Sequence, residues 1–227
     1  MISNILFDLD DTLLDFKRTE RVALTDTLNE LGVPPKDETV SLYSGINLSL
    51  WKRLERGEIT VDVLRVMRFE MLFSALGLDI CAQRATDIYG KNLALGAFLV
   101  DGAVDVLEKL FGKYSLYVAS NGIPEVQRSR IAKSKIAPYF RDIFISAEIG
   151  FAKPDIGFFE HCFARMDNFS KEETVIIGDS LSSDILGGIT AGIKTVWLAN
   201  PVAASGDVTP DARISSLYEL PELLRKM

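Results

Sequence analysis

Short apolar runs alternate with amphipathic stretches over most of this chain. Such runs, each ending at polar or turn residues, predict strands that are buried on both faces. Five strands are predicted, at residues 2–7, 116–119, 143–145, 174–177 and 194–198. Helical stretches separate the last four strands, and a final helix is predicted at 217–224 after a loop at 200–210. This alternation predicts an α/β protein with a parallel, doubly wound sheet of the Rossmann-like kind.

The alternation stops between the first and second strands. Apolar residues in that interval recur at helical spacing, and glycine, proline and Thr60 supply the helix ends. Helices are predicted at residues 19–31, 40–54, 60–76 and 81–93. We therefore predict a core formed by residues 1–15 and 96–227, with an all-helical cap inserted at 16–95.

Composition excludes several classes of protein. With 227 residues, 48% of them hydrophobic and 25% charged, the chain has an ordinary globular make-up. A net charge of −7 argues against nucleic acid polymers and anionic membranes as partners, but not against a small phosphorylated substrate. The chain lacks a basic leader and any apolar run of about 20 residues. We therefore predict a cytoplasmic monomer or homodimer without a signal peptide, in which Cys81 and Cys162 are buried free thiols.

Three carboxylates stand directly after the first predicted strand, on Asp8, Asp10 and Asp11. Side chains alternate along an extended chain, so Asp8 and Asp10 are able to point to the same side, where their charges repel. A divalent metal would relieve that repulsion. A calcium loop of the EF-hand type is excluded, because it needs glycine and glutamate where this chain has Leu13 and Thr19. The plainer alternative is that the acids form a turn and cap the next helix.

Polar residues also follow two later strands. Ser120 and Asn121 stand at the end of the second strand, and Asp179 follows the fourth, with Asp184 close behind. Each of these, and Lys153 likewise, has an ordinary explanation as a turn former, a surface cation or a helix-surface acid. The carboxyl ends of parallel strands, however, meet at one edge of the sheet, where open α/β folds bind their ligands. Their joint placement therefore predicts one site.

In chain order, these residues resemble the four motifs of the haloacid dehalogenase (HAD) superfamily of phosphatases. The motifs are Asp8-x-Asp10-x-Thr12, Ser120-Asn121, Lys153-Pro154, and Gly178-Asp179 with Asp184. They span residues 8 to 184 with ordinary spacing, so the resemblance covers the whole predicted core. The helical insert resembles the cap of that superfamily. The resemblance implies a Mg²⁺-dependent phosphatase.

The resemblance also implies the catalytic roles. Asp8 would attack phosphorus and form an aspartyl-phosphate, while Asp10 would protonate the leaving oxygen and later take a proton from water. The dehalogenating relatives lack an acid at the position of Asp10, because halide leaves without a proton. Asp10 therefore favours a phosphate ester over a carbon–halogen bond.

The same resemblance implies the ligands of the metal and of the phosphate. Mg²⁺ prefers oxygen ligands, and the superfamily pattern assigns it to Asp8, the main-chain carbonyl of Asp10, and Asp179, with Asp184 as support. The phosphoryl group would be bound by Ser120, Asn121 and Lys153. Other machinery is missing: His161 is the only histidine and lacks a G-x-S-x-G elbow, and there is no P-loop or G-x-G-x-x-G motif.

Four residues of the predicted cap bear on the substrate. Tyr43, Asn47 and Trp51 recur every four residues and so share a helix face, and Phe16 stands at the junction with the core. Together with the segment 195–200, they resemble the pyrimidine 5′-nucleotidases of the superfamily. The resemblance implies pyrimidine nucleoside 5′-monophosphates as substrates, with these four residues determining specificity. The alternative is that the aromatic residues simply pack inside the cap.

Other functions stay open at this point. The chain would also suit a phosphatase for another small metabolite, such as phosphoglycolate or a sugar phosphate. A phosphomutase or phosphotransferase would pass the phosphoryl group to a second hydroxyl instead of water. A binding module without catalysis is a third possibility, which the intact acids at positions 8, 10, 179 and 184 disfavour.

Overall fold

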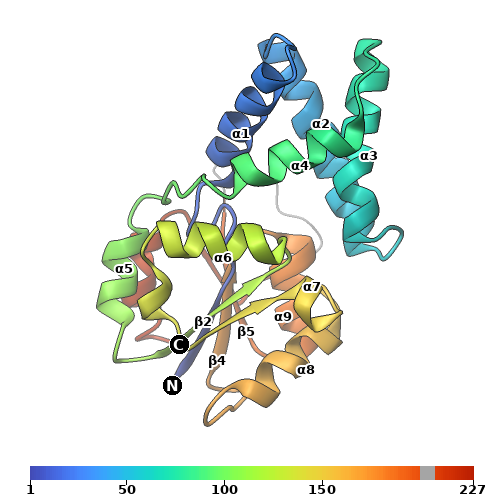
Figure 1. Ribbon diagram of the computed structural model, residues 1–227. Coiled ribbons are helices and arrows are strands. Elements are labelled where there is room, and N and C mark those ends of the chain that lie inside the picture. The colour runs from blue at the N-terminus through green and yellow to red at the C-terminus, as the bar shows by residue number, and fades with distance from the viewer. Residues whose placement is uncertain (200–207) are drawn as a thin grey trace. The chain divides into compact units, whose positions relative to one another are not determined.

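The computed structural model describes residues 1–199 and 208–227, so the predicted loop at 200–210 lies largely outside the described residues. Contacts divide the chain into two compact units, drawn in Figure 1. The first, here called the sheet unit, comprises Met1–Asp15, Leu99–Pro124 and Ser134–Met227. The second, the helical unit, comprises Phe16–Phe98 and Glu125–Lys133.

Among the described residues, six parallel strands form the sheet of the sheet unit, in the order β3-β2-β1-β4-β5-β6. Their bounds are β1 Asn4–Phe7, β2 Ser115–Ser120, β3 Asp142–Ile145, β4 Thr174–Gly178, β5 Lys194–Leu198 and β6 Ala212–Ile214. The five predicted strands and the doubly wound α/β class are confirmed, whereas β6 was not predicted. The order reverses direction between β1 and β4, and Rossmann-type sheets bind their ligands at that switch point.

The helices of the sheet unit are mostly short. They are α5 Ala103–Leu110, α7 Ser146–Ile149, α8 Ile156–Arg165, α9 Leu186–Ala191 and α10 Leu220–Leu223. Two 3₁₀ turns, Ala137–Tyr139 and Leu217–Glu219, and a π-helical turn, η2 Leu181–Ile185, complete it. The predicted last helix is therefore a 3₁₀ turn that runs into α10.

Both faces of the sheet are covered. On one face, Leu6, Tyr117 and Ile176 pack against Phe158 of α8 and Ala191 of α9. The alternate strand residues point the other way and are just as buried, as period-two alternation requires: Ile5, Phe7, Val118 and Ile177. In Figure 1, α5 lies on the opposite side of the strands from α8 and α9. Burial on both faces explains why these strands read as continuous apolar runs.

The helical unit contains α1 Phe16–Glu30, α2 Asp37–Glu55, α3 Val61–Leu76 and α4 Ala82–Leu93, with most of α6 Pro124–Lys133. Within it, α1 packs on α4 and α2 packs on α3. The predicted ends of α3 are confirmed: the Thr60 hydroxyl accepts a hydrogen bond from Val63 N, and Gly77 closes the helix at φ +64°.

Helix α6 belongs with the helical unit through two hydrogen bonds to the segment that follows α4. Arg130 Nε donates to the Gly96 carbonyl at 2.9 Å, and Ser129 Oγ donates to the Ala94 carbonyl at 2.8 Å. The predicted cap of 16–95 does not include this helix. A later segment thus joins a unit that is otherwise one continuous insert.

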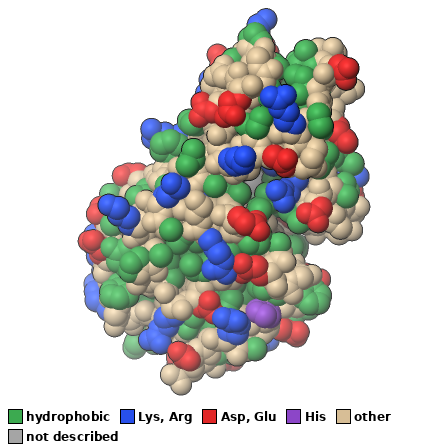
Figure 2. Space-filling model, viewed as in Figure 1, with side chains coloured by type: hydrophobic (Ala, Val, Ile, Leu, Met, Phe, Trp, Pro, Cys, Tyr) green, Lys and Arg blue, Asp and Glu red, His purple; other side chains and the backbone are tan. Residues whose placement is uncertain are grey.

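Surface and thiols add three observations. Acidic and basic side chains are interspersed on the face shown in Figure 2, without a broad patch of either sign. Among the described residues, no helix combines the length and apolar character needed to cross a bilayer. Cys162 is buried and free as predicted, but Cys81 is exposed, because it stands just before α4.

Candidate active site

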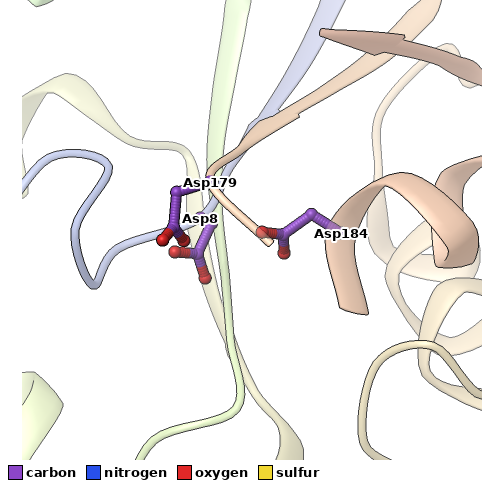
Figure 3. Close-up of side chains that lie close together, drawn as sticks. All are labelled: Asp8, Asp179 and Asp184. Carbon is purple, nitrogen blue, oxygen red and sulfur yellow. The ribbon is translucent and has the colours of Figure 1, made fainter. Parts of the chain in front are cut away.

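Three carboxylates meet where β1 and β4 end. Phe7 pairs with Ile177 in the parallel register, and Asp8 N donates to the Ile177 carbonyl at 2.9 Å, so the two strands end side by side. Asp8 and Asp179 are the first residues after these strands, and Asp184 follows in the turn η2. One carboxylate oxygen of each lies within 4.8 Å of the others (Figure 3). The predicted convergence of these three acids is what the structure shows.

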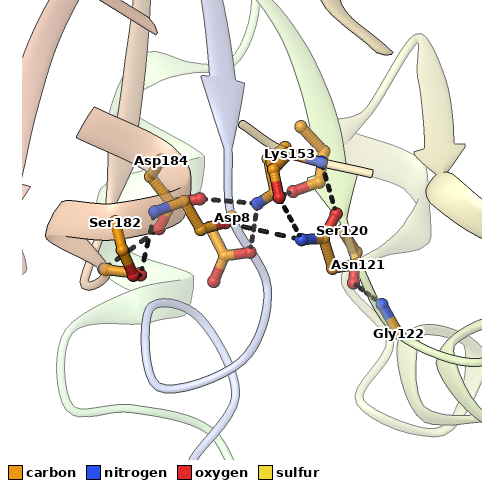
Figure 4. Close-up of polar contacts among 10 residues, drawn as sticks. Asp8, Ser120, Asn121, Gly122, Lys153, Ser182 and Asp184 are labelled. Atoms are coloured by element: carbon orange, nitrogen blue, oxygen red, sulfur yellow. Dashed lines mark hydrogen bonds and ion pairs between the residues drawn. The ribbon is translucent and has the colours of Figure 1, made fainter. Parts of the chain in front are cut away.

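Lys153 bridges two of these acids from inside the protein. Its Nζ donates to Asp8 Oδ1 at 2.7 Å, to Asp184 Oδ1 at 2.6 Å and to the Ala119 carbonyl at 2.6 Å (Figure 4). An ammonium has three protons, so these three acceptors use its full capacity. The side chain is only 1% exposed, which excludes the alternative of a surface cation.

Burial and charge together set the protonation of this cluster. Burial, together with the charges of Asp184 and Asp10, raises the pKa of Asp8 to about 7, against the lowering effect of the Lys153 ammonium. For Lys153, burial opposes the charged form, but the carboxylates of Asp184 and Asp8 outweigh it and raise the pKa of the ammonium. Lys153 therefore stays charged at neutral pH.

The remaining negative charge fits a divalent cation. Lys153 brings one positive charge to the carboxylates of Asp8 and Asp184, and all three carboxylates, Asp179 included, have an oxygen within 4.8 Å of the others. Carboxylate oxygens are the ligands that Mg²⁺ prefers in proteins. The donor set of this cluster therefore suits Mg²⁺, as predicted for Asp8 and Asp179 with Asp184 in support.

The turn η2 fixes the position of Asp184. Ser180 Oγ accepts a hydrogen bond from Ser183 N at 3.2 Å, and Ser180 N donates to Asp184 Oδ2 at 3.1 Å. A Cβ on Gly178 would overlap the Asp184 carboxylate, so glycine is required at the end of β4. Neither Gly178 nor Ser180 was assigned a role from the sequence. The Gly178-Asp179-Ser180 turn was the available signal.

Asn121 holds the Lys153 segment in place. Its Oδ1 accepts from Lys153 N at 2.9 Å, and its Nδ2 donates to the Lys153 carbonyl at 2.8 Å and lies 3.5 Å from Ser183 Oγ. The side-chain amide is thus bound to the main chain of Lys153. Ser120, buried at the end of β2, accepts from Gly122 N at 3.1 Å. Phosphate binding by Ser120 and Asn121 stays a prediction.

Asp10 lies in the tight turn that follows Asp8. Asp11 N donates to the Leu14 carbonyl at 2.7 Å, and Asp11 has a positive φ of 56°, a conformation that aspartate tolerates better than most residues. Asp10 is half-buried in this turn, and its charge lies near enough to Asp8 to raise the pKa of Asp8. Asp10 is thus placed beside the predicted nucleophile.

Two predicted specificity residues lie in the interior of the helical unit. Tyr43 is fully buried, with its ring 5.3 Å from Phe69 and 5.4 Å from Tyr89, centroid to centroid. Asn47 is 2% exposed; its Nδ2 donates to Glu20 Oε1 at 2.8 Å and its Oδ1 accepts from Arg68 at 3.4 Å. Packing, the alternative named for the aromatic residues, therefore describes Tyr43.

The other two specificity candidates are less buried. Phe16 and Trp51 are both half-buried. The Phe16 ring carries the Arg130 guanidinium 5.6 Å above its centre. Contact of any of the four residues with a substrate stays a prediction.

A parallel sheet that gathers three carboxylates and a buried lysine at its switch point is the arrangement of an α/β enzyme core with a candidate metal site. The family model of haloacid dehalogenase-like hydrolases matches residues 5–198, and the chain belongs to this family. The resemblance described from the motifs is thereby confirmed, and so is the prediction of a hydrolase.

Three relatives cover most of the chain. The HAD-hydrolase YfnB of Bacillus subtilis is 36% identical over 222 residues, which are 97% of this chain and 94% of YfnB. The pyrimidine 5′-nucleotidase PynA of Streptococcus pneumoniae is 43% identical over 85% of this chain and 82% of its own length. The pyrimidine 5′-nucleotidase YjjG of Escherichia coli is 30% identical, covering 98% and 97%. A crystal structure of YfnB bound to magnesium superposes with a TM-score of 0.93, at 35% identity over 98% of both chains.

Proposed function

We propose that this protein is a Mg²⁺-dependent phosphomonoester hydrolase that acts on pyrimidine nucleoside 5′-monophosphates through an aspartyl-phosphate on Asp8. The observation that carries the proposal is the buried Lys153 bridge between Asp8 and Asp184, with Asp179 beside it. A nucleophilic carboxylate must be ionised and held still; the Lys153 ammonium favours the charged form of Asp8 and fixes its position by a hydrogen bond.

The chemistry proceeds in two steps. An oxygen of Asp8 attacks phosphorus as the bond from phosphorus to the ester oxygen breaks, and Asp10 gives its proton to the departing alcohol. Water then attacks the phosphorus of the aspartyl-phosphate while Asp10 takes a proton from it, which releases inorganic phosphate and restores Asp8. The Ser120 hydroxyl holds a phosphoryl oxygen, with the Asn121 amide beside it, and the charge of the Lys153 ammonium balances those of Asp8 and the phosphoryl group.

Mg²⁺ would be held by Asp8, the main-chain carbonyl of Asp10, and Asp179, with Asp184 in support. When bound, it supplies the positive charge that the phosphoryl group needs beyond that of Lys153. The crystal structure of the relative YfnB bound to magnesium supports the choice of metal.

The substrate class rests on two relatives and on the helical unit. PynA and YjjG are both named as pyrimidine 5′-nucleotidases. The core motifs grip only the phosphate, so discrimination between esters needs other groups. We assign it to the helical unit acting as the cap, with Phe16 and Trp51 in contact with the base and Tyr43 and Asn47 keeping the shape of the helices.

The test is a panel of phosphate esters assayed for released phosphate, with and without EDTA. Uridine and thymidine monophosphates should be hydrolysed faster than purine nucleotides, phosphoglycolate or sugar phosphates, and EDTA should abolish activity until Mg²⁺ is restored. Asp8→Asn should lower kcat by about 10³-fold or more, roughly 4 kcal/mol in the barrier. The exposed Asp167→Asn is the matched control. Sugar phosphates ahead of every nucleotide, or an isomerised product without free phosphate, would replace the nucleotidase proposal with one of its alternatives.

A further inference from the structure

One peptide group in the candidate site is held at both of its ends. It joins Asp179 to Ser180, directly after β4. Its carbonyl oxygen accepts a hydrogen bond from Trp197 Nε1 at 2.8 Å, and its N–H, on Ser180, donates to Asp184 Oδ2 at 3.1 Å. The other oxygen of Asp184 binds Lys153, which in turn binds Asp8. A continuous series of hydrogen bonds thus leads from the Trp197 indole to the predicted nucleophile.

The indole of Trp197 is itself fixed in place. Trp197 pairs with Gly178 across β4 and β5, so its side chain starts beside the residue that precedes Asp179. It is 3% exposed and packs with Ile185 and with the partly buried Leu181, both in the turn η2. Arg213 of β6 places its guanidinium 4.8 Å from the centre of the indole ring. This packing fixes the direction of the indole N–H of Trp197.

We propose that Trp197 is a positioning residue for the acid cluster. Its N–H sets the rotation of the peptide between Asp179 and Ser180. That rotation decides where the Ser180 N–H meets Asp184, and fixing it holds the main chain at Asp179 in one conformation. The inference rests on the proposed function, because its consequence is the affinity of the cluster for Mg²⁺. Groups that orient metal ligands without touching the metal typically contribute 10–100-fold to affinity.

Loss of the indole N–H removes the hydrogen bond from Trp197 to the Asp179 carbonyl. The peptide is then able to rotate until its carbonyl meets another donor. The Ser180 N–H belongs to the same peptide, so it would no longer point at Asp184 Oδ2. Lys153 still bridges Asp184 and Asp8, so the acids stay grouped but are no longer held in one geometry. A weaker metal site in a folded protein is the expected result.

The experiment measures Mg²⁺ binding without substrate, by isothermal titration calorimetry and by the rise in Tm that Mg²⁺ produces. Trp197→Phe keeps an aromatic ring but removes the N–H, and its Kd for Mg²⁺ should rise about tenfold. A second replacement puts β-(benzothien-3-yl)alanine at position 197, so that sulfur takes the place of the N–H at nearly constant volume. It is made in a Trp51→Phe background, in which position 197 holds the only remaining tryptophan of the sequence. Its affinity should fall by the same factor relative to Trp51→Phe alone. The control Ile185→Val trims the same apolar cluster without touching a hydrogen bond. It should lower Tm and leave the Kd unchanged.

The outcomes separate the two proposals. If the unaltered protein shows no binding of Mg²⁺, the metal site and this inference are both wrong. If the unaltered protein binds Mg²⁺ and the replacements at position 197 bind it equally well, only the role of Trp197 is refuted. That role is also refuted if Ile185→Val weakens binding as much as Trp197→Phe does, because packing would then explain the effect.

Discussion

Replacing Lys153 with methionine tests the electrostatic description of the site most directly. Methionine has a similar length and no charge, so Lys153→Met removes the donor to Asp8, Asp184 and the Ala119 carbonyl while filling much the same volume. Two carboxylates then remain in the interior without their cation. We expect a large loss of stability in the absence of metal.

The size of that loss follows from how the two acids respond. Removing one partner of a buried ion pair typically costs about 3–5 kcal/mol, because a charge is left uncompensated. Lys153 has two such partners, but the effect is not doubled. The pKa of Asp8 is already raised to about 7 with the ammonium present, so without it Asp8 takes up a proton at neutral pH. The cost then falls mainly on Asp184, and we expect about 3–5 kcal/mol at pH 7.

The loss should also depend on pH. Above about pH 7, Asp8 in the unaltered protein has lost its proton, whereas in the variant it keeps the proton in the folded state and releases it on unfolding. A folded state that binds more protons than the unfolded state loses stability as pH rises. The deficit of Lys153→Met should therefore be larger at pH 8 than at pH 5.

Urea unfolding in EDTA at pH 5, 7 and 8 measures these differences. The exposed Lys113→Met is the control and should change the free energy of unfolding by no more than about 0.5 kcal/mol. Adding Asp184→Asn to Lys153→Met should recover part of the loss, since the uncompensated charge is gone. A cost below about 1 kcal/mol, or one that is equal at pH 5 and pH 8, would refute the reasoning.

Three further predictions follow from the same site and from the helical unit. Without metal, the Tm of the unaltered protein should fall as pH rises from about 4 to 7, because the pKa of Asp8 is about 7 in the folded state and 3.8 ordinarily. In thermal melts, Asp8→Asn should make the Tm less dependent on pH. Asp10→Asn should cost about 10²-fold or more in kcat on nucleotides but far less on p-nitrophenyl phosphate, whose leaving oxygen scarcely needs a proton; equal losses in steady-state assays would exclude general acid catalysis. Asn47→Ala should lower the free energy of unfolding by about 1–3 kcal/mol in urea, since it removes the buried hydrogen bonds to Glu20 and Arg68, and an unchanged stability would contradict the network.

The fold was predictable where burial is symmetric. Strands β1, β2, β4 and β5 are covered on both faces, so their sequences are unbroken apolar runs. Strand β6 has only Ala212, Arg213 and Ile214, and such a short edge strand leaves no apolar run to detect. Its pairing is supported by Asp211, whose Oδ2 accepts from both the N–H and the hydroxyl of Thr195 at 2.8 Å. The contact joins residues 16 apart in the sequence, and no local sequence pattern predicts it.

The site was predictable as a set of residues but not as a set of bonds. The carboxyl ends of β1 and β4 lie together because the strands are parallel, so the proximity of Asp8 and Asp179 was predictable. The hydrogen bonds of Asn121 depend on the path of the loop that carries Lys153, and that path does not follow from sequence spacing. The role proposed for Trp197 depends on the register between β4 and β5, which packing likewise sets.

The cap residues show what helical spacing leaves undecided, and they give the last prediction. Tyr43, Asn47 and Trp51 share a face of α2, but that face turns inward, so Tyr43 is 0% and Asn47 2% exposed. Stacking on a base needs an accessible ring face, and Trp51, half-buried near the end of α2, is the most exposed of the three residues. Trp51→Ala should therefore cost about 1–3 kcal/mol in kcat/KM on pyrimidine nucleotides, by analogy with single-strand stacking, and leave p-nitrophenyl phosphate hydrolysis unchanged. Tyr43→Phe is the matched control, because it keeps the buried ring and should change neither substrate. Equal losses on both substrates for Trp51→Ala would mean that Trp51 supports the helical unit and does not contact the base.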